Sequence, residues 1–186
     1  MPSLSGNLSE DEKALREAVT AAARDVLSSL PFDFPEGNFH SRRRFVSDAA
    51  TWLALSSIPD PDDIRPAPSA GEPDTRARTM RLVTVSTGAS DYNARGKVWN
   101  LTFVVKVGFG FVDERPEGRG NSFDALQKAV HTLLQQFVED ATLGFGDAVE
   151  VYRARQVGEP RFVAADAQGR AAHVSDLEVF LSVEVC

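Results

Sequence analysis

The feature that most constrains the fold is a long alternation of apolar and other residues in the second half of the chain. The positions between the apolar residues are mostly polar or glycine. Because successive side chains of a β-strand point to opposite faces of a sheet, a period of two predicts a long strand with one buried face. The apolar positions are Trp99, Leu101, Phe103, Val105, Val107, Phe109 and Phe111.

Other segments supply partners for this strand. Residues 81–86 predict a second strand, and the polar residues 88–96 then form the hairpin loop between the two. Shorter strands are expected over residues 148–155, 161–165 and 170–174, with a turn at 166–169. The alternation returns at the end of the chain and predicts a last half-buried strand with Leu177, Val179, Leu181, Val183 and Val185 on its apolar face.

Two amphipathic helices can cover such a sheet. The first is expected over residues 9–30, where Ser9 acts as the N-cap and Glu12 completes a capping box. Its apolar face consists of Leu15, Val19, Ala22, Val26 and Leu30. The charged residues Lys13, Arg16, Glu17 and Arg24 fall largely off that face. The second begins at a Ser122 cap, and its apolar stripe consists of Leu126, Val130, Leu133 and Phe137, joined by Phe123 and Leu134.

The order of elements predicts an α+β fold, an antiparallel β-sheet or sandwich flanked by two amphipathic helices, with long irregular loops. We expect one domain over residues 1–186. Residues 32–79 read as an irregular, proline-rich insertion between the first helix and the 80–186 region. Within it, residues 45–55 predict a short helix or strand, and residues 56–79 an extended loop that contacts a neighbouring subunit.

Composition excludes several classes of function. The net charge of −7 disfavours a protein that grips nucleic acid phosphates. No apolar run reaches the roughly 20 residues of a membrane span, and the polar N-terminus does not resemble a secretory signal. The single cysteine, Cys186, allows neither an intramolecular disulfide nor a cysteine-based zinc site.

No motif carries a positive case for catalysis. The segment 107–112 resembles the RNA-binding signature of an RNA recognition motif, but Val107 stands where a basic residue belongs. We therefore predict core packing for Phe109 and Phe111. His40, His131 and His173 lack metal-ligand spacing, and the acidic cluster at 60–63 lacks the register of a calcium loop. We predict no catalytic, cofactor-binding or metal-binding residue and a chain that is not an enzyme.

Charged residues outside the predicted elements are the candidates for a subunit interface. Arg42, Arg43 and Arg44 form the only basic run. Acidic side chains of the loop before the second helix are expected to pair with them across a subunit boundary. The interface candidates in that loop are the acidic Asp113, Glu114 and Glu117, together with Arg115 and Arg119.

The pattern as a whole resembles the tail terminator, or tail completion, proteins of tailed phages. The likeness is carried by the hairpin 81–111, the helix 123–140 and the final strand 177–185. It implies a structural virion protein, assembled in the host cytoplasm, that forms a homohexameric ring. Such a ring caps the tail tube and joins it to the head–tail connector, and DNA passes through without specific binding.

Two alternatives stay open on the sequence alone. The first is a related tail tube or head–tail connector subunit, because these share the α+β sandwich. The second is of a different class, a small-ligand-binding or enzymatic α+β domain with a pocket between helix and sheet.

Overall fold

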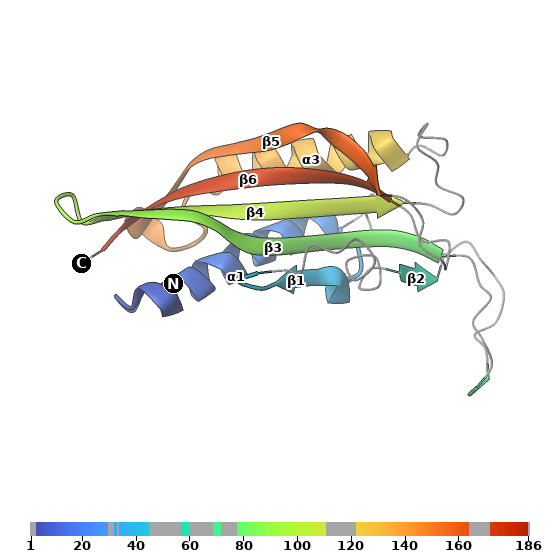
Figure 1. Ribbon diagram of the computed structural model, residues 1–186, viewed down its shortest axis with the longest axis horizontal. Coiled ribbons are helices and arrows are strands. Elements are labelled where there is room, and N and C mark those ends of the chain that lie inside the picture. The colour runs from blue at the N-terminus through green and yellow to red at the C-terminus, as the bar shows by residue number, and fades with distance from the viewer. Residues whose placement is uncertain are drawn as a thin grey trace.

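A computed structural model describes residues 3–29, 32, 34–44, 57–59, 69–71, 78–110, 122–163 and 172–185. These residues form an α+β fold in which two helices lie against one curved, six-stranded sheet (Figure 1). The predicted fold class is confirmed.

The predicted central strand is β4, Val98–Gly110, and it lies in the middle of the sheet. It pairs along its length with β3, Arg78–Asn93, on one side and with β6, Ala172–Glu184, on the other. Its odd-numbered side chains are buried from Trp99 to Phe109, as the alternation predicts. β4 is therefore paired along both edges and covered on one face, as expected of the central strand of a sheet.

The strand order is β1-β3-β4-β6-β5, and β2 also pairs with β3. The short strands β1, Phe39–Ser41, and β2, Ser57–Pro59, lie beside β3, and β5, Val149–Val163, pairs with β6. All these pairs are antiparallel except β1 with β3, which run parallel. The sheet is therefore mixed, whereas the sequence predicted a purely antiparallel one.

The β3–β4 hairpin is longer than predicted. Residues 88–93 were predicted to be loop, but they belong to β3, and the turn occupies only residues 94–97. The pairing register shifts between Thr87 and Ser90, so an irregularity interrupts the alternation there. At Gly88 a Cβ atom would lie 3.0 Å from the carbonyl oxygen of Thr102, which explains why the smallest residue stands at this close approach.

The strands at the end of the chain are also continuous where the sequence predicted pieces. Within the described residues, the expected strands 148–155 and 161–165 fall in one strand, β5, and the expected strands 170–174 and 177–185 fall in one strand, β6. Two register shifts in β5, after Val151 and after Val157, break the period of two and make one strand look like two. The alternation of buried residues from Leu177 to Val183 in β6 is confirmed.

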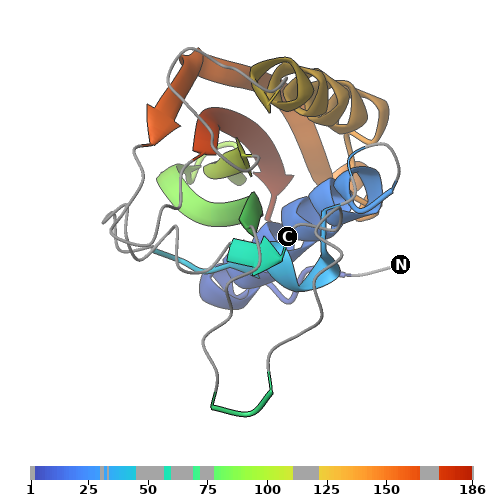
Figure 2. The same ribbon diagram turned by 90° about the vertical axis from the view of Figure 1, so that its right-hand side faces the viewer.

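Helices α1, Leu8–Leu27, and α3, Ser122–Glu139, lie side by side on the same face of the sheet (Figures 1 and 2). Helix α3 packs across β4, β5 and β6, and α1 packs against β1 and β3. The predicted stripe of α3 is confirmed for Leu126, Val130, Leu133 and Phe137, which are fully buried, but it was wrong for Phe123, which is 36% exposed. Ser122 is the first residue of α3 rather than the residue before it.

The start of α1 differs from the predicted capping box. Asn7 is the N-cap, and its side-chain oxygen accepts a hydrogen bond from the backbone N–H of Ser9 at 3.1 Å. Asp11 reaches back to the backbone N–H groups of Ser5 and Gly6 at 2.7 and 3.0 Å. Glu12 is thereby free to point toward the sheet, where it has a different role.

Several predictions lie outside the described residues. These are the element at 45–55, most of the 56–79 loop, the turn at 166–169, and the residues Leu30, Phe111 and Cys186. Within the 56–79 range, Ser57–Pro59 forms β2 and β3 begins at Arg78, so the prediction of continuous loop was wrong at both places.

The core register gives a direct test. Phe103 is fully buried in the middle of β4, whereas the neighbouring Thr102 lies half-exposed on the opposite face. We expect Phe103→Ala to lower the free energy of unfolding by about 3–5 kcal/mol. Thr102→Ala should lower it by less than about 1 kcal/mol. Urea denaturation of both variants measures the difference, and equal losses would contradict this register.

Candidate functional site

Only three of the eight predicted interface residues lie in the described part of the chain. Arg42, Arg43 and Arg44 are exposed and directly follow β1. The backbone N–H of Arg42 donates to Val85 O at 3.1 Å, and Arg43 O accepts from Thr87 N at 3.3 Å, which holds the run beside β3. Asp113, Glu114, Arg115, Glu117 and Arg119 fall outside the described residues.

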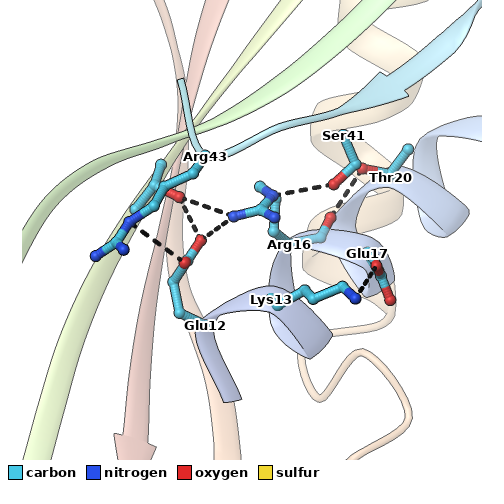
Figure 3. A network of polar contacts seen from close by, with 8 residues as sticks. Glu12, Lys13, Arg16, Glu17, Thr20, Ser41 and Arg43 are labelled. Carbon is cyan, nitrogen blue, oxygen red and sulfur yellow. Dashed lines mark hydrogen bonds and ion pairs between the residues drawn. The ribbon is translucent and has the colours of Figure 1, made fainter. Parts of the chain in front are cut away.

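Arg43 has an ionic partner within its own chain. Its Nε lies 3.8 Å from Oε2 of Glu12, a residue that is only 5% exposed (Figure 3). Reversing the charge of Arg43 would therefore act on the fold as well as on assembly.

Glu12 and Arg16 form the buried polar centre beneath Arg43 (Figure 3). Glu12 Oε1 contacts both Arg16 Nη1 and Thr87 Oγ1. Arg16 Nε donates to Ser41 Oγ at 3.1 Å, and Nη1 lies 3.3 Å from Thr87 Oγ1. These contacts join α1 to β1 and β3, and the two charged side chains, Glu12 and Arg16, are almost fully withdrawn from water.

The sequence prediction that Arg16 lies off the buried face was wrong, since it is 7% exposed. The available signal was the spacing of Glu12 and Arg16, because oppositely charged side chains four residues apart on a helix can contact each other. Lys13 and Glu17 show the same spacing and stay exposed, with 3.9 Å between Nζ and Oε1. Spacing alone thus could not tell the buried pair from the exposed one.

A second surface, which the sequence did not predict, lies on β5 at the edge of the sheet. We call it the β5 surface and define it by Tyr152, Arg153, Arg155, Val157 and the neighbouring Phe180 of β6. Tyr152 is 52% exposed and Val157 is 45% exposed, high values for side chains of this size. The irregular register of β5 hides this surface from a search for alternation.

The β5 surface is built around the ring of Phe180. The guanidinium carbons of Arg153 and Arg155 lie 5.7 and 5.4 Å from the ring centroid, and the ring of Tyr152 lies 6.1 Å away. Distances of this size are typical of cation–π contact. Arg155 also donates through Nε to Glu178 Oε2 at 2.8 Å, which fixes its side chain over the ring.

The aromatic segment that resembled an RNA-binding signature is part of the core as far as it is described. Phe109 is 4% exposed, and its ring centroid lies 5.6 Å from that of Phe34. The guanidinium carbon of Arg81 lies 5.2 Å from the same ring. A ring enclosed in this way has no face on which a base could stack.

The three histidines lie in three different elements, His40 in β1, His131 in α3 and His173 in β6. His131 is exposed on α3, whereas His173 is buried with its ring 5.8 Å from Phe123 and 5.4 Å from Phe162. Burial, and to a smaller degree the charge of Arg42, lowers the pKa of His40 below its usual value. Among the described residues, no three His, Cys, Asp or Glu side chains are grouped so as to hold a metal ion.

The helices in the described part of the chain include none that is long and apolar enough to span a membrane. No protein-family model matches the sequence, and a search of curated proteins gave no match either.

The buried ion pair can be tested against the exposed pair of the same helix. Arg16→Met leaves the Glu12 carboxylate buried without its nearest cation, so we expect a loss of about 3 kcal/mol or more in the free energy of unfolding. Lys13→Met removes the same kind of pair from the exposed side, and its cost should stay below about 0.5 kcal/mol. Chemical denaturation measures the free energy of unfolding of both variants. Similar losses would show that burial of Glu12 does not increase the contribution of its ion pair to stability.

The RNA-binding interpretation is tested by Phe109→Ala. Because the ring is enclosed, the substitution should cost about 3–5 kcal/mol of stability. We expect no specific binding of single-stranded RNA by the wild-type protein at physiological salt, measured by fluorescence anisotropy. Sub-micromolar binding by the wild type, lost in a variant that still folds, would contradict core packing as the role of Phe109.

Proposed function

We propose that the chain is a structural, non-enzymatic subunit that assembles with copies of itself into a closed ring. By its resemblance to the tail terminator proteins, the ring would cap the tail tube of a phage and join it to the head–tail connector. The subunit would be assembled in the host cytoplasm and end in the tail of the virion. Six copies is the number that the resemblance implies.

The observation that carries this proposal is the open edge of β5. This strand has 15 residues, and in the described sheet it pairs only with β6. An edge of that length presents backbone N–H and C=O groups that another chain can bind, and proteins usually shorten or cover such edges. A long exposed edge with apolar side chains such as Tyr152 and Val157 favours a partner over solvent.

The two sides of the molecule differ, which favours a head-to-tail contact. One side ends in β5, and the other ends in α1 and the short strands β1 and β2 (Figures 1 and 2). A contact between unlike surfaces is heterologous, and it closes into a ring when the rotation between successive copies divides a full turn. A ring of this kind needs no cofactor and no catalytic residue.

Net charge gives only partial support for an acidic channel through which DNA slides. The chain carries −7, but most of the excess acidic residues belong to segments outside the described residues. The described part contains nearly equal numbers of acidic and basic side chains. The charges of the described residues therefore do not mark one face as the wall of the channel.

Ring formation is tested by native mass spectrometry and sedimentation velocity over a wide range of protein concentration. We expect one closed oligomer, six copies by the resemblance, in equilibrium with monomer, because a closed ring satisfies every interface at a single size. Circular dichroism of the same samples confirms that the monomer is folded. A folded protein that stays monomeric at the highest concentration would contradict the proposal and favour the ligand-binding alternative.

A further inference from the structure

The β5 surface has the composition of a protein-binding patch. Aromatic residues and arginine are enriched at protein interfaces, and tyrosine and arginine are common among the residues that dominate binding energy. Tyr152, Arg153 and Arg155 stand together here, all exposed, on a rigid sheet. Their packing around Phe180 holds the side chains in place before any partner binds.

The charges around this surface argue against a nucleic acid. Glu150 and Glu159 are exposed on the same strand and flank the arginines on either side. Glu178 already accepts hydrogen bonds from Arg155 between the strands. A polyanion that ran along β5 would meet carboxylates at both ends, so the positive charge suits a short acidic surface better than a continuous phosphate backbone.

The opposite side of the same molecule offers such an acidic surface. Glu10, Glu17 and Asp25 are exposed on α1, at separations of seven and eight residues. Because a helix repeats after about 3.6 residues, these three carboxylates lie on one stripe, which we call the α1 stripe. Two basic residues lie close to it: Lys13, which is already paired with Glu17, and Arg24, whose guanidinium carbon lies 5.8 Å from the centroid of the Phe39 ring.

The positions of the two surfaces fit a head-to-tail contact. In Figure 1, β5 lies along the upper side of the molecule and α1 along its lower side. The β5 surface therefore cannot meet the α1 stripe of its own chain, but it can meet that of a second copy. Neighbouring arginines of β5 are two residues apart, about 7 Å along a strand, so both can reach one acidic stretch of a helix.

We propose that the β5 surface of one subunit docks on the α1 stripe of the next copy of this chain. The inference rests on the proposed ring and names the two surfaces that meet in it. Opposite charges orient the encounter, and Tyr152 and Val157 lose their exposure to water in the contact. This docking does not need the predicted acidic partners of the arginine run 42–44. Those partners lie outside the described residues.

The test is a charge exchange between the two surfaces. Arg153→Glu with Arg155→Glu reverses the β5 surface, and Glu17→Arg with Asp25→Arg reverses the α1 stripe. Each double variant should self-associate at least tenfold more weakly than the wild type in sedimentation velocity at 150 mM salt. In a 1:1 mixture each altered surface again meets its complement, so alternating rings should form at close to wild-type concentration.

A matched control reverses two charges elsewhere. Arg95→Glu with Lys97→Glu changes the turn of the β3–β4 hairpin, which belongs to neither surface, and it should assemble like the wild type. Circular dichroism and thermal melting of every variant separate loss of contact from loss of fold. Tyr152→Ala, which leaves all charges in place, should also weaken assembly.

The outcomes are distinguishable. If the wild type forms rings and both charge variants do so equally well, this docking is wrong and the ring proposal stands. If both variants dissociate but their mixture does not assemble, the two surfaces do not face each other and the docking is again wrong. A wild type that never assembles overturns both proposals. Sub-micromolar binding of a single-stranded DNA oligonucleotide, lost on reversing Arg153 and Arg155 without any self-association, would assign the β5 surface to nucleic acid.

Discussion

The structure depends on the burial of one face of β4 under the helix layer, while β3 and β6 pair along its two edges. Phe103, Val105 and Val107 are fully buried on that face, and the residues paired with them from β3 and β6 are mostly apolar too. A shift of one residue in either pairing would turn these side chains toward the opposite face. Both helices pack against the layer that this register creates, and β5 reaches its place at the edge only through β6.

The parts of the fold that depend on regular periodicity could be predicted from the sequence. The α3 stripe and the buried positions of β4 and of the last strand follow from repeats of 3.6 and 2. The predictions failed where a register shift breaks the period, as after Thr87 in β3 and after Val151 and Val157 in β5. The parallel pairing of β1 with β3 could not be predicted, because three residues carry no pattern.

The candidate surfaces were harder to predict than the fold. Arg43 could be singled out as part of a basic run, but its contact with Glu12 joins segments about 30 residues apart and has no signal in the sequence. Arg16 looked like a surface residue because a charged side chain is rarely buried without a partner. Only the fold brings Ser41 and Thr87 within reach of it. The β5 surface went unseen because its residues were read as parts of separate short strands.

The strand order also has a consequence for how the chain reaches its native state. The pairs β3–β4 and β5–β6 each join neighbouring strands of the sequence, whereas β4 and β6 pair residues as far apart as Val98 and Glu184. The two pairs β3–β4 and β5–β6 can thus form from contacts nearby in the sequence. Pairing of β4 with β6 requires closure of the long connection that contains α3. Until β4 and β6 pair, each has an unpaired edge beside an uncovered apolar face, and such edges pair readily with other chains. The union of two halves that are each built locally is therefore the folding step at which bare strand edges are most open to pairing with other chains.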